Sequence, residues 1–478
     1  MDVTTALQRA FAANSPRLSP RGTPAAGWLI HLAVIALWAA LFAQAFVGVG
    51  AGFWSIGIAY LGYDTLLSMF VLWQTVPMLR TRPSPARLAA PTVAVLIAAY
   101  NEAAVLPATV RSVLAQTDPV DVIVIADDGS VDHTAAVLAA CFGLSAPAMG
   151  ALSEPARHDP RLRWLRLAHA GKAVALNGAL LAVDTDVVIT MDADTLPARD
   201  AVAAIRRAFA DDPRLVVAGG VLIPACGSAL RNRVLQCFQT YEYMRNFLSR
   251  YAWMRVNSLL LISGAFAGFR RAAVLTVGGF DPDCLVEDYE LIHRLHRRSR
   301  DDRLGWRVEV VGRAVARTDA PGTIVGFLRQ RRRWFGGFLQ TQYWNRDVTG
   351  NPRYGWLGLA MMPVKAVDTV QPVYGLTALV LLVVLAATGN VAVLVPVGAI
   401  VLAKLIFDVL AYLWSIHLYR CWTGRRDSTH VGYALLAAVC EPFSFIPLLH
   451  TGALLGWWQF LTGRHTWVPQ RRTALTTW

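Results

Sequence analysis

The sequence has little charge and almost no lysine. Charged residues make up 16% of its 478 residues and hydrophobic residues 55%, and only three of its 45 basic residues are lysines. A soluble protein of this length needs more charge to cover its surface. The apolar residues also gather near the N-terminus and after residue 355. The composition therefore argues against an ordinary soluble enzyme and favours a membrane protein with a soluble central region.

Several familiar signatures are missing as well. The six cysteines include no Cys-x-x-Cys pair, which argues against a zinc site and a disulfide framework. No Gly-x-Gly-x-x-Gly follows the first predicted strand, and Gly171-Lys172 is followed by Ala173, so neither a dinucleotide fingerprint nor a P-loop is present. No aromatic-interleaved basic stripe of the kind that binds single strands is present, so we expect no nucleic-acid partner despite the net charge of +13.

Apolar runs long enough to cross a bilayer lie near both ends of the sequence. Gly27–Val49 and Phe53–Leu79 come first, and Arg80, Arg82 and Arg87 follow them. Because positive residues flank membrane helices on the cytosolic side, we expect the next domain in the cytosol. The sequence thus predicts a multi-pass protein of the cell inner (plasma) membrane, with the lipid bilayer as a partner.

Three further apolar runs follow residue 355, and the last is interrupted by Glu441, Pro442 and Pro447. We therefore expect about three C-terminal membrane helices. The predicted organisation is a cytosolic tail with little regular structure (1–25), two membrane helices (26–80), a soluble domain (83–321), an interfacial helix (322–350), about three membrane helices (355–461) and a basic tail (462–478).

Short apolar runs alternate with helical patterns in the central region, which predicts an α/β domain with a parallel-rich, Rossmann-like sheet. Ligands of such sheets bind at the carboxyl ends of the strands. Ala229–Ser249 has a long aromatic-rich helical pattern, and Gly322–Trp344 is too charged to cross the membrane and fits an amphipathic interfacial helix. The predicted strands are Thr92–Ala98, Val120–Ala126, Leu162–Leu167 and Val187–Met191.

Polar clusters stand where these strands end or a helix begins. They are Ala99-Tyr100-Asn101-Glu102, Asp127-Asp128-Gly129-Ser130, Asp192-Ala193-Asp194 and Glu287-Asp288. Any single cluster could be an ordinary turn or helix cap. Four in succession indicate a site, and the pair Asp192 and Asp194 is suited to a hard cation, Mg²⁺ or Mn²⁺, whose other ligands come from a diphosphate. Such a cation would neutralise charge on a departing nucleotide diphosphate.

The order of these motifs resembles glycosyltransferase family 2, in particular the membrane-integrated processive synthases of poly-N-acetylglucosamine, cellulose, chitin and hyaluronan. The resemblance covers roughly residues 85–345 and includes Gly171–Asn177 and the string Gln330-Arg331-Arg332-Arg333-Trp334, which matches QxxRW. It implies a glycosyltransferase A-type domain. It also implies an inverting transfer from a UDP-sugar, UDP-N-acetylglucosamine or UDP-glucose, to a growing polysaccharide at the cytosolic membrane face, with coupling to export as an option.

The resemblance further implies roles for residues on the nucleotide side. Asp127 would contact the base, with Tyr100 and Glu102 lining the uridine pocket. Lys172 would meet the diphosphate as a point charge, although a solvated surface lysine is the plain alternative. For the metal, Asp192 would bind both ribose and cation, and Asp194 would be the direct ligand.

Other implied roles concern catalysis and the acceptor. Asp288, next to Glu287, would be the catalytic base, or else a helix cap. Gln330 and Arg333 would touch the diphosphate, and Trp334 would stack on a sugar ring. These three could equally be interface anchors. The loop that positions the acceptor would contain Gly264 and Phe266. His293 and His296 share a helix face and could ligate a metal, but ordinary helix positions suit them better.

Three functions stay open. The first is a processive transferase whose membrane helices form a channel, with Asp368, Lys404 and Asp408 facing it, because ionisable groups within spans are costly unless functional. It could work with accessory export or secretion subunits. The second is a non-processive transferase that acts on a lipid or lipid-linked acceptor. The third is an inactive membrane scaffold or transport subunit.

Overall fold

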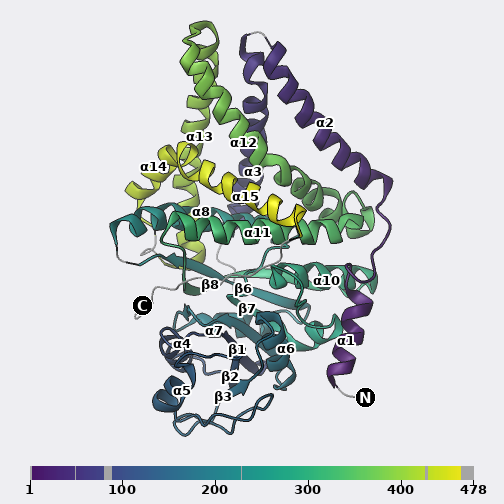
Figure 1. The fold of residues 1–478 in the computed structure, drawn as a ribbon, viewed down its shortest axis with the longest axis vertical. Helices are drawn as coiled ribbons and strands as arrows, with labels where there is room; N and C mark the ends of the chain where they lie inside the picture. Colours follow the sequence, from purple (N-terminus) through teal and green to yellow (C-terminus); the bar gives the residue numbers. More distant parts are fainter. Residues whose placement is uncertain (1–2, 49, 80–88, 228, 426–428, 464–478) are drawn as a thin grey trace.

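The computed structural model of the protein describes residues 3–48, 50–79, 89–227, 229–425 and 429–463. A sheet domain forms one half of the molecule and a bundle of long helices the other (Figure 1). The predicted basic flank at Arg80, Arg82 and Arg87 and nearly all of the predicted basic tail lie outside the described residues.

One eight-stranded sheet forms the core of the domain, in the order β3-β2-β1-β4-β7-β6-β8-β5. The first four of these pair in parallel, whereas β7 is antiparallel to both β4 and β6. This mixed, parallel-rich sheet confirms the predicted α/β class. The strands are β1 (Val93–Ala99), β2 (Val122–Asp127), β3 (Leu162–Arg166), β4 (Val187–Asp192), β5 (Thr195–Pro197), β6 (Leu215–Ala225), β7 (Phe266–Arg270) and β8 (Arg307–Asp319).

The central strands are mostly apolar and buried up to their polar ends, because helices cover both faces of the sheet. Their register brings Ala99 opposite Asp127 and Ala98 opposite Asp192, so the polar turns that follow meet at one edge. The helices of the domain are α4 (Leu106–Leu114), α5 (Thr134–Phe142), α6 (Lys172–Leu181), α7 (Ala201–Asp211), α9 (Arg271–Thr276) and α10 (Glu287–Asp301).

Two long helices lie between the sheet and the membrane helices (Figure 1): α8 (Leu230–Arg255) and α11 (Ile324–Trp344). The second is capped at Thr323, whose side chain accepts a hydrogen bond from the Gly326 N–H. Short turns follow it: η3 (Arg346–Val348), η4 (Pro352–Tyr354) and the π-helical η5 (Leu357–Met361).

Four helical segments in the described residues are long and apolar enough to cross a membrane, or five crossings if a bent pair counts as one. The pair is bent by 52° at a break that follows Phe443, close to Pro442, which has no N–H for a helical hydrogen bond. The elements are α2 (Ala25–Val47), η1 (Gly50–Trp54), α3 (Ser55–Thr75), η2 (Val76–Leu79), α12 (Met362–Thr388), α13 (Val391–Thr423), α14 (Val431–Cys440), η6 (Glu441–Phe443) and α15 (Phe445–Leu461).

The N-terminal segment is more ordered than the sequence predicts. It contains the helix α1 (Val3–Asn14), which packs beside the sheet domain. Arg17, just after the helix, pairs with the fully buried carboxylate of Asp281 at 3.0 Å. The ring of Phe11 lies 4.9 Å from the guanidinium of buried Arg294. These partners are over 260 residues away in sequence, so local composition could not reveal them.

Candidate active site

Two polar turns after β1 and β2 are joined by direct hydrogen bonds. The N–H of Asn101 donates to Ser130 Oγ at 2.9 Å, and Asn101 Oδ1 accepts from the N–H of Val131 at 2.8 Å. Asn101 has a left-handed backbone with φ of 56°, a conformation that asparagine tolerates better than most residues. The predicted nucleoside residues Tyr100, Glu102 and Asp127 therefore lie on two neighbouring turns.

Both carboxylates of the Asp127-Asp128 pair are buried and hydrogen-bonded. Asp127 accepts from the Ser130 N–H at 2.9 Å and from the indole N–H of Trp164 at 3.2 Å. Asp128 accepts from the N–H groups of Ala170 and Gly171, at 2.8 and 3.1 Å. The second aspartate, to which the motif assigned no role, thus fixes the loop that leads to Lys172.

An aromatic stack lies beside these turns. The rings of Tyr100 and His169 are 4.2 Å apart and nearly parallel, and His169 Nδ1 lies 2.8 Å from Asp128 Oδ2. The sequence reasoning missed His169, because a single histidine in a loop carries no pattern.

Lys172 stands at the first turn of α6, where three elements meet. Its Nζ lies 2.7 Å from Asp192 at the end of β4 and 3.1 Å from Glu287 at the start of α10. Burial alone would lower the pKa of Lys172, but the carboxylates of Asp192, Glu287 and Asp288 outweigh it and raise that pKa. The lysine is therefore a cation paired with carboxylates of two other elements, while 36% of its side chain stays exposed.

Asp288 lies in the first turn of α10. Its carboxylate accepts hydrogen bonds from the N–H of Gly264 at 2.6 Å and from its neighbour Tyr289 at 2.8 Å. Burial and the adjacent Glu287 raise the pKa of Asp288. A carboxylate with a raised pKa is a stronger base, which suits proton abstraction near neutral pH.

Gly264 and Phe266, the two residues predicted for the loop that positions the acceptor, lie in different surroundings. Gly264 lies against Asp288, where an added Cβ would come within 3.2 Å of the carboxylate. Phe266, in contrast, is 1% exposed and packs in the core of the sheet. The predicted contact between Phe266 and the acceptor stays a prediction that this burial does not favour, since both faces of β7 are covered and Phe266 packs in the core.

The Asp192–Asp194 turn is hydrogen-bonded to the helix α4. Thr109 Oγ1 donates to the carbonyl of Ala193, between the two carboxylates, at 2.6 Å. In the described part of the chain, no three metal-ligating side chains of His, Cys, Asp or Glu gather into one cluster. Two carboxylates facing a cavity nevertheless fit Mg²⁺ or Mn²⁺, because such cations take few protein ligands and complete their shell with phosphate and water oxygens.

The two histidines of α10 are core residues. His296 Nε2 lies 2.8 Å from the carbonyl of Leu259, and the His293 ring meets Tyr289 edge to face. Burial lowers the pKa of His293 to about 3 and that of His296 to about 4. Both are therefore neutral and packed, as the plainer interpretation of the sequence holds.

One cavity of about 500 Å³ extends from the carboxylates at the end of β4 and the start of α10 to the helices α8 and α11 above the sheet. Of the predicted site residues, Tyr100, Glu102, Asp127, Gly264 and Phe266 are not in its lining. Its lining includes the predicted residues Lys172, Asp192, Asp194, Glu287, Asp288, Gln330, Arg333 and Trp334. The cavity continues between the membrane helices, where Tyr60, Asp64, Asp368, Glu441 and His450 line it.

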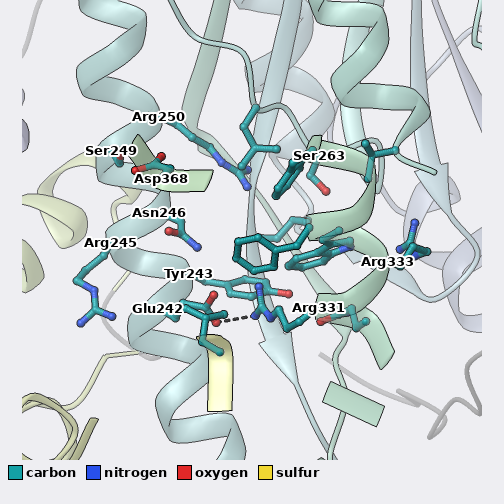
Figure 2. A pocket seen from close by; sticks show the side chains of 18 of the residues that line it. Glu242, Tyr243, Arg245, Asn246, Ser249, Arg250, Ser263, Arg331, Arg333 and Asp368 are labelled. Carbon is teal, nitrogen blue, oxygen red and sulfur yellow. Dashed lines mark hydrogen bonds and ion pairs between the residues drawn. The ribbon is translucent and has the colours of Figure 1, made fainter. Parts of the chain in front are cut away.

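The helix α11 forms the wall opposite the strand ends. Arg333 Nη1 donates to the carbonyl of Leu285 at 3.1 Å, which ties α11 to the loop before Asp288. Trp334 is half-buried beneath the guanidinium of Arg331, whose central carbon lies 4.4 Å from the ring centre. Arg331 and its partner Glu242 on α8 are joined by the dashed line in Figure 2. Both line the cavity, and the sequence reasoning assigned neither a role.

Comparison with known proteins gives consistent matches. Residues 94–278 match the model of Glycosyl transferase family 2, and residues 187–395 match that of Glycosyl transferase family group 2. The chain is 30% identical over 246 residues to the poly-beta-1,6-N-acetyl-D-glucosamine synthase of Staphylococcus aureus (strain COL), covering 51% of this chain and 53% of that protein. It is 28% identical over 260 residues to the synthase of the same name from Staphylococcus epidermidis, covering 53% and 57%.

The chain thus spans about half the length of the curated relatives it matches. Among solved structures it is similar to a mannosyltransferase from Pyrobaculum calidifontis in complex with GDP-Man and Mn²⁺, with a TM-score of 0.53 and 22% identity. That likeness covers 82% of this chain and 99% of the other, and it supports the fold.

Proposed function

We propose that this chain, whose residues 94–278 and 187–395 match the models of Glycosyl transferase family 2 and Glycosyl transferase family group 2, is an inverting, metal-dependent polysaccharide synthase. It takes a sugar from a UDP-sugar, UDP-N-acetylglucosamine before UDP-glucose, and adds it to a growing glycan at the cytosolic face of the inner membrane. The curated relatives are named for a polymer of N-acetylglucosamine, which favours that donor.

One observation carries this proposal: a single cavity runs from the strand-end carboxylates past Trp334 to polar groups among the membrane helices. A second cavity of about 110 Å³ shares Tyr60 and Asp64 with it and reaches Lys404 and Asp408. Lys404 pairs with Asp64 at 2.8 Å and with Asp408, so each of these charged groups has a partner of opposite sign. An uncharged but hydroxyl-rich glycan is suited to such a polar, internally paired path.

The donor would bind across the strand ends. Tyr100, Glu102 and Asp127 would hold the nucleoside, and Asp192 with Asp194 would hold the cation. When bound, that cation supplies positive charge against the diphosphate. The Lys172 ammonium has three N–H donors, two of which face carboxylates. The third would be free for a phosphate oxygen, and Gln330 and Arg333 would approach the diphosphate from α11.

Transfer would then be a single displacement. The acceptor hydroxyl loses its proton to Asp288 as its oxygen bonds to the anomeric carbon of the donor sugar. The bond from that carbon to the diphosphate oxygen breaks at the same time, and UDP leaves with the electron pair. Lys172 and Arg333 would stabilise the developing negative charge, and attack opposite the leaving group inverts the anomeric centre.

The proposal is tested with the purified full chain in lipid nanodiscs and a panel of radiolabelled UDP-sugars, with Mg²⁺, with Mn²⁺ and with a chelator. We expect metal-dependent incorporation from UDP-N-acetylglucosamine into products of many lengths. Products of one addition only would support the non-processive alternative. UDP binding without any turnover would support the inactive scaffold.

A further inference from the structure

The helices α8 and α11 are joined by a buried ion pair above the site. Arg331 Nη2 donates to Glu242 Oε2 at 2.6 Å, and the two side chains are 3% and 7% exposed. From this geometry we infer that the pair positions Trp334 and thereby sets the affinity for the acceptor glycan. The inference rests on the proposed function, and it makes Arg331 and Glu242 positioning residues that do not touch the reacting atoms.

Arg331 is clamped from several directions. Its guanidinium lies 4.4 Å from the ring centre of Trp334 and 4.7 Å from that of Phe327. Gly452 of α15 approaches it so closely that an added Cβ would lie 2.6 Å from Arg331 Cβ. A cation held over an indole face attracts the ring and restricts its tilt. The face of Trp334 that remains for a sugar is thereby fixed.

The pair is part of a longer row of alternating charges. One turn after Glu242 on α8, Arg245 binds Glu441 through two hydrogen bonds, at 2.5 and 2.7 Å. Glu441 stands at the break between α14 and α15 and also accepts from Tyr412 of α13. Figure 2 shows Arg245, Glu242 and Arg331 along one side of the pocket. The row therefore connects Trp334 with the membrane helices.

Simple packing does not explain this pair. Burying two charges is costly, and apolar side chains of similar size hold helices together as well or better. An apolar residue at 331 would, however, remove the cation from the indole face and leave Trp334 freer to tilt. The charge is therefore better explained by what it does to Trp334 than by what it contributes to stability.

The test uses the full chain in nanodiscs with UDP-N-acetylglucosamine and a soluble β-1,6-linked N-acetylglucosamine oligosaccharide. The variants are Glu242→Gln, Arg331→Gln and the exchanged double variant Glu242→Arg with Arg331→Glu. Arg329→Gln is the matched control, because Arg329 lies on the same helix and is exposed. The KM for each substrate, hydrolysis of the donor without acceptor, and the melting temperature are measured for each.

We expect the single variants to raise the acceptor KM about tenfold, while the donor KM and donor hydrolysis stay within about twofold of the wild type. The exchanged variant should recover the melting temperature but not the acceptor KM, because its cation now lies on α8. It remains informative if a single variant fails to fold.

Two results would overturn the inference: an acceptor KM in Glu242→Gln equal to that of Arg329→Gln, or recovery of melting temperature and acceptor KM together in the exchanged variant. Failure of the proposed function is distinguishable from both, since the wild type would then not extend the oligosaccharide at all.

Discussion

In the sheet domain, three carboxylates of the motif residues are fixed by backbone N–H groups, whereas on the membrane side of the cavity the side chains are fixed by ion pairs between helices. Asp127, Asp128 and Asp288 accept from main-chain donors on turns of the sheet domain. Arg331 and Arg245 reach across 89 and 196 residues to Glu242 and Glu441.

This difference has a functional consequence. The backbone of a packed sheet fixes the positions of the donor-side groups independently of how the helices α8 and α11 pack above it. The acceptor side depends on how α8, α11 and α15 pack against one another. We therefore expect changes on the strand-end side to abolish chemistry, and changes on the membrane side to alter acceptor use while donor chemistry continues.

The largest effect is expected at Asp288. Replacing Asp288 with Asn removes the proton acceptor, and transfer should fall about a thousandfold because a general base contributes factors of that order. UDP affinity, measured by calorimetry, should be unchanged. Retained turnover in this variant would exclude Asp288 as the base.

A smaller loss is expected at Lys172. Lys172→Gln removes the cation that faces the leaving diphosphate, so turnover should fall about a hundredfold, for donor hydrolysis and for transfer alike. Lys172→Arg keeps the charge with a different shape and should be intermediate. If only acceptor KM changed, the donor-side assignment of Lys172 would be wrong.

The pH dependence follows from the raised pKa of Asp288. A base works only when deprotonated, so transfer should decline as the pH falls through that pKa, about tenfold for each further unit. Because the pKa is raised, this acidic limb should begin above the ordinary aspartate range near pH 4. UDP binding followed over the same pH range is the control. If the transfer rate declined only within the ordinary aspartate range, the raised pKa of Asp288 would be contradicted.

On the membrane side, Gly456 allows α15 to approach α11 closely. A Cβ there would lie 2.8 Å from the backbone nitrogen of Gly336 and 2.9 Å from the carbonyl oxygen of Arg332. Gly456→Val should therefore destabilise the protein by about 1–3 kcal/mol and raise the acceptor KM, with donor hydrolysis preserved. Gly398→Val, in α13 with open space around it, is the matched control. If donor hydrolysis fell as much as transfer to the acceptor, the expected independence of the donor side from the membrane side would be contradicted.

The smallest effect is expected at the N-terminal segment. Arg17→Ala leaves the buried carboxylate of Asp281 without its guanidinium, which should cost about 1–3 kcal/mol of stability. Gln8→Ala, at an exposed position of α1, is the control. The melting temperature measured by scattering in detergent distinguishes them, and equal values would mean that the Arg17–Asp281 pair contributes little to stability.

Much of the donor side could be predicted from the sequence. The apolar runs before Asp127 and Asp192 are buried strands, and the polar residues after them come together because parallel strands end at one edge. Lys172 stood out because lysine is so rare in this chain. The structure adds the reason that these turns hold their shape, such as the hydrogen bonds that the N–H groups of Ala170 and Gly171 donate to Asp128.

The sequence by itself therefore determined the α/β class, the apolar segments and the order of the donor-side motifs, because these are written in local periodicity and composition. Tertiary structure alone decided that Phe266 turns into the core, that α1 docks on the domain, and that Arg331 rather than Arg332 pairs with Glu242. The physical reason is the same in each case: these contacts join residues far apart in the chain, and only close packing of distant elements brings them together.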